Sequence, residues 1–165
     1  MDIQARFGDK IYSLGTVTWG HFADLCFSIA PAVSATCKHW YTNDGDGLNA
    51  DQTIKLAGSL ETRILDGTVD EHIAARLFLA NSLPDEICKY CNGTGIRTDA
   101  IGLKFGFSSK PIQDPDHPRY AQSGWCNGCD GKGHLRPFDS HYDLTKQTVE
   151  ELTSFLRTSG GFRIW

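Results

Sequence analysis

The chain has no run of apolar residues that approaches the roughly 20 needed to cross a bilayer as a helix, so the sequence predicts no membrane span. Residues 1–7 also lack the apolar stretch of a secretory leader. We therefore expect a cytoplasmic protein, in which cysteine thiols stay reduced and available to a metal.

The chain also lacks an excess of positive charge. The 165 residues include 16 Lys and Arg against 20 Asp and Glu, a net charge of −4. Residues 86–136 carry seven basic and five acidic side chains, a net +2. Four thiolates on one Zn²⁺ contribute about −2 and bring this segment close to neutral. Because duplex DNA is bound by strongly basic faces, the charge pattern disfavours it as a partner.

The sequence also lacks the local patterns of a catalytic site. It shows no nucleophile beside a base and no open-metal constellation. We predict a protein that is not an enzyme. An enzyme is the weakest of three hypotheses, and a water-filled cleft with clustered titratable residues would favour it.

What the chain does have is cysteine in a repeated pattern. Four of its six cysteines lie in two copies of C-x-x-C-x-G-x-G, at residues 88–95 and 126–133. Two thiolates at this spacing span one edge of the tetrahedron around Zn²⁺, and two copies fill the coordination shell. The pattern predicts one structural zinc per chain, with the ligands Cys88, Cys91, Cys126 and Cys129.

The glycines that follow each cysteine pair support a metal. Gly93, Gly95, Gly131 and Gly133 allow the chain to turn back sharply and bring backbone N–H groups close to sulfur. A redox dithiol or a pair of disulfides is the alternative. A redox C-x-x-C usually opens a helix, however, and a helix tolerates Gly-x-Gly poorly.

The repeats resemble the cysteine-rich domain of the DnaJ co-chaperone family, which carries four such copies and binds two zincs. A similar half-size arrangement occurs in the late-gene antiterminator Q of lambdoid phages and in the anti-TRAP protein. The resemblance covers residues 88–133 and implies a zinc module in a phage or prophage protein. A J-domain is not implied, because the chain has no His-Pro-Asp tripeptide; His117-Pro118-Arg119 differs at the third position.

The hydrophobic pattern predicts an α+β fold, in which a small helical body carries a DnaJ-type zinc-binding β-hairpin module. We expect a helical region at 1–85, the four-cysteine module with a long insert at 86–136, and a C-terminal helix and tail at 137–165 that pack on the N-terminal region. Residues 3–14 are compatible with a β-hairpin that turns at residues 8–9.

Five helices are indicated by apolar spacing and capping residues. One covers 18–30, and a short one follows from 31 to 38. Two more begin at Asn49 and Thr68, each with a capping-box partner three residues later, and we expect them to pack as a helical hairpin. A further capping box at Thr148 predicts a C-terminal helix, followed by a short strand or docked tail.

The insert between the half-sites is the expected binding region. Residues 108–124 are polar and rich in proline, and loops of this length are often functional. We assign Trp125, Tyr120 and Arg119 to a partner-facing surface. A protein partner is the leading hypothesis, with a nucleic-acid or transcription-complex partner, as for antiterminator Q, as the alternative.

The aromatic and basic side chains of this region allow two interpretations. The aromatic residues are Tyr90, Phe105, Phe107, Tyr120 and Trp125, and the basic residues are Lys89, Lys104, Lys110 and Arg119. The mixture is typical of surfaces that stack single-stranded nucleic acid. We favour the other interpretation, a small hydrophobic core for the zinc module.

The two remaining cysteines are predicted to be structural. Cys26 lies on the apolar side of the helix at 18–30, which indicates burial in the core. Cys37 and His39 form a C-x-H pair for which the sequence shows no matching second half-site.

Overall fold

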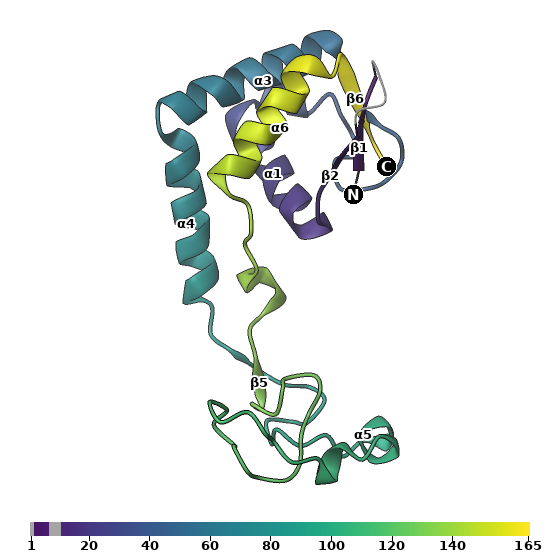
Figure 1. Ribbon diagram of the computed structural model, residues 1–165. Helices are drawn as coiled ribbons and strands as arrows, with labels where there is room; N and C mark the ends of the chain where they lie inside the picture. Colours follow the sequence, from purple (N-terminus) through teal and green to yellow (C-terminus); the bar gives the residue numbers. More distant parts are fainter. Residues whose placement is uncertain (1, 7–10) are drawn as a thin grey trace. The chain divides into compact units, whose positions relative to one another are not determined.

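A computed structural model describes residues 2–6 and 11–165, which form two compact units (Figure 1). The first unit consists of the chain up to Asn81 together with His141–Trp165, and the second of Ser82–Ser140. The interval 86–136 expected for the zinc module lies inside the second unit. No helix in the described part of the chain is both long and apolar enough to cross a membrane.

A small antiparallel sheet closes one side of the first unit. Its order is β2 (Ile11–Ser13), β1 (Asp2–Ala5), β6 (Gly161–Ile164) and β3 (Gly47–Asn49). Ile3 lies opposite Ile164, and Leu48 lies opposite Phe162. These four side chains are buried, because residues that pair directly across a sheet point to the same face. The predicted C-terminal strand is confirmed, and the turn predicted at residues 8–9 lies outside the described residues.

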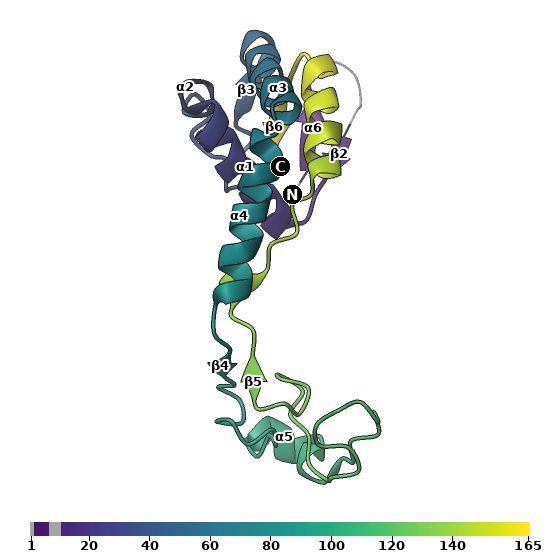
Figure 2. The ribbon, with the colours of Figure 1, turned by 90° about the vertical axis from the view of Figure 1, so that its left-hand side faces the viewer.

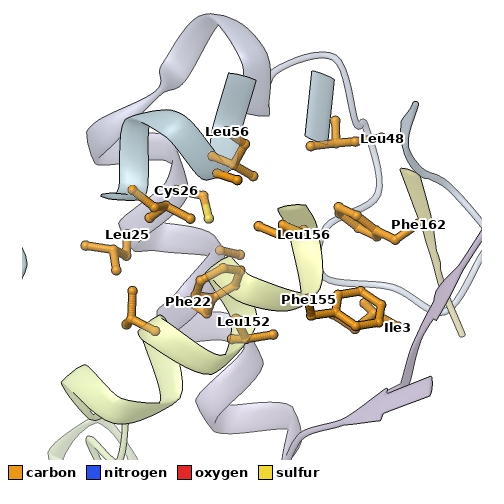
Figure 3. Close-up of a cluster of buried hydrophobic side chains, with 14 of the residues drawn as sticks. Ile3, Phe22, Leu25, Cys26, Leu48, Leu56, Leu152, Phe155, Leu156 and Phe162 are labelled. Carbon is orange, nitrogen blue, oxygen red and sulfur yellow. The ribbon is translucent and has the colours of Figure 1, made fainter. Parts of the chain in front are cut away.

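Five helices accompany this sheet in the first unit and complete an α+β fold. They are α1 (Thr16–Ile29), α2 (Pro31–Ser34), α3 (Ala50–Leu65), α4 (Thr68–Ser82) and α6 (Lys146–Thr158). Figure 3 shows apolar side chains of several elements gathered in one cluster, among them Phe22 from α1, Leu56 from α3, Leu156 from α6 and Phe162 from β6. Cys26 is fully buried in the same cluster, as predicted. The C-terminal helix and strand therefore share a core with the N-terminal region.

The predicted helical hairpin is wrong. Figure 1 shows α3 and α4 meeting at a bend rather than lying side by side, and α3 packs along α6 instead. The reason is that the apolar stripe of α3, with Leu56 and Leu60, is already covered by other core elements, whereas α4 buries only Val69 and Ala80.

The capping residue predicted for α3 is the one observed, whereas that predicted for α6 is not. At α3, the Asn49 side chain accepts a hydrogen bond from the Gln52 N–H, and the Gln52 side chain accepts one from the Asn49 N–H, so the capping box is confirmed. At α6, Thr145 caps the helix through a bond from the Thr148 N–H, so α6 begins one turn before the predicted Thr148.

Candidate metal centre

The second unit is built around a two-stranded ladder. β4 (Glu86–Ile87) and β5 (His134–Leu135) run antiparallel, with Ile87 opposite His134 (Figure 2). The Cys88 N–H continues the pairing by donating to the Gly133 carbonyl at 2.9 Å. The ladder therefore joins the start of the first half-site to the end of the second.

The four motif cysteines meet at the end of this ladder. Their sulfur atoms all lie within 4.8 Å of one another, and all four residues are buried. Across the two half-sites, the Sγ of Cys88 lies 3.9 Å from that of Cys126, and the Sγ of Cys91 lies 3.7 Å from that of Cys129. A tetrahedral Zn²⁺ with bonds of about 2.3 Å requires sulfur atoms about 3.8 Å apart. The four thiols can therefore hold one metal ion.

The two half-sites have the same local conformation. The Cys91 N–H lies 3.3 Å from the Cys88 carbonyl, and in the second copy the corresponding distance, from Cys129 to Cys126, is also 3.3 Å. After the second cysteine of each pair, Asn92 and Asp130 have positive φ angles of 49° and 51°. A duplicated sequence motif has thus produced a duplicated backbone turn.

Each half-site also supplies hydrogen bonds to its sulfurs. The Gly95 N–H donates to the Cys91 Sγ at 3.3 Å, and the Gly133 N–H donates to the Cys129 Sγ at 3.2 Å. Both positions exclude a side chain, because a Cβ on Gly133 would lie 2.3 Å from the Gly93 carbonyl oxygen and one on Gly95 would lie 2.2 Å from the Gly131 carbonyl oxygen. These N–H groups stabilise thiolates, which are the metal-binding form of cysteine.

The thiols of Cys129 and Cys88 have pKa values that are shifted in opposite directions. Burial raises the pKa of Cys129 to about 12. Burial also opposes ionisation of Cys88, but hydrogen bonds from the Tyr90 N–H, from the Cys129 and Cys91 thiols and from the Cys91 N–H outweigh it, so the pKa of Cys88 lies below its ordinary value. A divalent metal among the sulfurs would supply the positive charge that favours the Cys129 thiolate at neutral pH.

Little else holds this unit together. Among the described residues of the second unit, the buried apolar side chains other than the four cysteines are Ile112 and Pro137. Leu135 packs partly buried against the cysteine cluster. A segment of this size with so small a core needs a metal or disulfides to fold. The four cysteines are not paired in disulfides, and their sulfurs lie close enough together to hold one metal ion.

The insert is tied to both half-sites by Arg119. Its Nη1 donates to the Gly95 carbonyl at 2.9 Å and to the Gly131 carbonyl at 3.3 Å. Nearby, the buried His117 uses both ring nitrogens: Nε2 lies 2.6 Å from the Asp130 carbonyl, and Nδ1 accepts from the Arg119 N–H. Arg119 thus links the half-sites internally, and its predicted contact with a partner stays a prediction.

A second arginine supports the same turns. Arg97 is buried, forms an ion pair with Asp99 at 2.8 Å and donates to the Asn127 side chain. Its guanidinium also lies 4.8 Å from the centre of the Tyr90 ring. Arg97 was not predicted from the sequence as a residue of the site. The sequence signal that could have indicated it was its partner Asp99, which caps the following helix α5 (Ala100–Lys104) by accepting from the Gly102 N–H.

The aromatic residues do not form the small core that we favoured. Phe105 is 64% exposed, Tyr120 is 54% exposed and Tyr90 is 42% exposed, while Phe107 and Trp125 are half-buried. The predicted core is absent because the cysteine cluster occupies the centre of the unit and leaves the rings at the surface. Trp125 and Tyr120 are therefore accessible, and their role in partner binding stays a prediction.

The other candidate residues serve the first unit. Cys37 is buried, burial raises its pKa to about 11, and the His39 Nδ1 lies 3.2 Å from the Asp44 carboxylate. Within residues 2–6 and 11–165, the only grouping of His, Cys, Asp or Glu suited to a metal is the four-cysteine cluster.

No protein-family model, curated protein or solved structure matches this chain. The DnaJ-type and phage resemblances therefore rest on the repeated motif alone. They stay predictions, as does the cytoplasmic location.

Proposed function

We propose that this protein is a non-enzymatic interaction module whose second unit is organised by a structural zinc ion. Cys88, Cys91, Cys126 and Cys129 would hold the metal through four thiolates, and zinc bound in this way stabilises a fold without activating water. The observation that carries the proposal is the closed donor set: four buried sulfurs within 4.8 Å of one another, with no histidine or carboxylate among the described residues joining them.

Metal analysis and cobalt substitution test this proposal directly. Zinc analysis of reduced, full-length protein should give one zinc per chain, and Cys88→Ser should abolish tight binding. Replacement of zinc by cobalt should give the visible absorption of tetrahedral thiolate coordination. A spectrum typical of five or six ligands would contradict the closed shell, because it requires water at the metal.

A protein partner is the function that the surface supports best. A module with so little core presents most of its side chains to solvent, including Phe105 and Tyr120. Exposed aromatic side chains of this kind mark interaction sites. Zinc-loaded protein used as bait in an extract of its native cell should enrich a specific protein, and chelated protein should not. If the zinc-loaded bait enriches no protein, the interaction proposal fails.

A further inference from the structure

Five side chains of the second unit form a continuous line, here called the aromatic row: Lys104, Phe105, Phe107, Trp125 and Lys110. Phe107 and Trp125 are half-buried, and the other three are exposed. The Phe105 and Phe107 rings stack with centres 5.9 Å apart, and Phe107 meets Trp125 edge to face at 5.2 Å. The ammonium groups lie at the two ends. Lys104 is 5.7 Å from the centre of the Phe105 ring, and Lys110 is 4.0 Å from that of Trp125.

The row is held in place by the backbone that leads into the metal centre. The Trp125 N–H donates to the Phe107 carbonyl at 2.8 Å, and the Trp125 carbonyl accepts from the Arg97 N–H at 3.1 Å. The indole Nε1 donates to the Asp130 carboxylate at 3.0 Å, which fixes the ring. Trp125 also directly precedes the ligand Cys126. The geometry of the row is therefore coupled to the metal centre.

Both lysines of the row are available for an anionic partner. Neither Lys104 nor Lys110 forms an ion pair with any residue that the structure describes. The arginines of the same unit differ, because Arg97 and Arg119 are engaged by internal acceptors. The row thus presents apolar surface in the middle and an unneutralised cation at each end.

We propose that the aromatic row binds a short acidic segment of a protein partner. Apolar side chains of that segment would pack on Phe105 and Trp125, and its carboxylates would meet Lys104 and Lys110. This inference rests on the proposed function and adds the place of binding and the chemistry of the partner. Carboxylates are favoured because lysine pairs with them without disrupting the cation–π contacts at the ring faces.

Two observations favour a peptide over single-stranded nucleic acid. Bases bind such surfaces by stacking on exposed ring faces. Here Lys110 covers a face of Trp125, and Phe105 is in contact with both Lys104 and Phe107. Phosphate binding also requires a positive field. The net +2 of residues 86–136 is cancelled by four thiolates on one Zn²⁺, which together carry about −2.

A random-peptide display library panned on zinc-loaded, full-length protein tests this inference. Enriched sequences should combine Asp or Glu with Phe, Trp, Leu or Ile, and the best of them, made as a labelled peptide, should lose binding when zinc is chelated. The double variant Lys104→Glu with Lys110→Glu should bind this peptide at least about tenfold more weakly, because two favourable charge contacts become repulsive. Lys132→Glu is the matched control, since Lys132 is an exposed lysine of the same unit outside the row.

Phe105→Ser provides a second, uncharged test at an exposed position, and it should also weaken binding severalfold. Both variants should keep one zinc per chain. Enrichment of basic or proline-rich peptides, unchanged binding by either variant, or tight binding of oligouridylate that depends on the two lysines would each overturn the inference. If the variants still enrich the same protein from cell extract as the wild type, the site is wrong while the interaction function stands. If the wild type enriches neither peptide nor protein, the proposed function itself fails.

Discussion

Two glycines of the metal centre have the same backbone angle and different surroundings, which makes them a matched pair. Gly93 and Gly133 both have φ of +85°. A Cβ on Gly93 would lie 3.6 Å from its nearest neighbour, the Ile87 side chain, whereas a Cβ on Gly133 would lie 2.3 Å from the Gly93 carbonyl oxygen. Gly93→Ala therefore tests the left-handed conformation alone, and Gly133→Ala adds a steric clash with the backbone.

The expected magnitudes follow from these contacts. A left-handed alanine costs about 1–2 kcal/mol, and metal binding and folding of the module are linked, so Gly93→Ala should weaken zinc binding about 5- to 30-fold. In Gly133→Ala, relief of the clash moves the backbone. That movement should break the bond from the Gly133 N–H to the Cys129 sulfur and the bond from the Cys88 N–H to the Gly133 carbonyl. A bond to a charged group contributes about 1.5–3 kcal/mol and a neutral one about 0.5–1.5 kcal/mol. Gly133→Ala should thus bind zinc about 30- to 2,000-fold more weakly than Gly93→Ala.

Competition with a chromophoric chelator under reducing conditions measures both affinities. Gly67→Ala is the outside control, because Gly67 has φ of +84°, has open space around its Cβ position and belongs to the first unit. It should lower the stability of the first unit and leave zinc affinity unchanged. Equal zinc affinities for Gly133→Ala and Gly93→Ala would refute the reasoning, since the close approach of the two half-sites would then have no energetic consequence.

Three further predictions concern the two units. Chelation should raise hydrogen exchange throughout residues 82–140 while the first unit stays protected, and equal protection with and without chelator would contradict the role given to the metal. Replacing residues 109–122 with a short Gly-Ser linker should weaken zinc binding because it removes Arg119 from the Gly95 and Gly131 carbonyls, and unchanged affinity would show that this link is dispensable. Burial opposes ionisation of Asp46, but N–H groups of Gly47, Lys38 and His39 outweigh it and lower its pKa. The stability contributed by Asp46 is therefore present above about pH 4 and is lost as the pH falls. In urea titrations, Asp46→Asn should show a shallower loss of stability in acid than the wild type, and parallel curves would argue against this role.

Sequence alone predicted that the four motif cysteines form one cluster, because the geometry of each half-site is local. Each C-x-x-C-x-G-x-G copy folds into the same turn within eight residues, and only the meeting of two such turns involves distant parts of the chain. The core positions of α1 and the capping box of α3 were predictable for the same reason, since apolar spacing and the pairing of Asn49 with Gln52 act within one or two turns of helix.

What the tertiary structure decided depends on contacts between residues far apart in the sequence. Residues 47–49 carry no strand pattern, and they become β3 because the end of the chain, as β6, supplies the hydrogen-bonding partner. From the sequence, the aromatic residues around the insert were predicted to form a small core. They lie at the surface because the four cysteines occupy the centre of the unit, and Arg119 faces inward because the carbonyls of both half-sites converge on it. A sequence pattern sets which groups are available, but competition for the limited interior volume of a small unit determines which of them become buried.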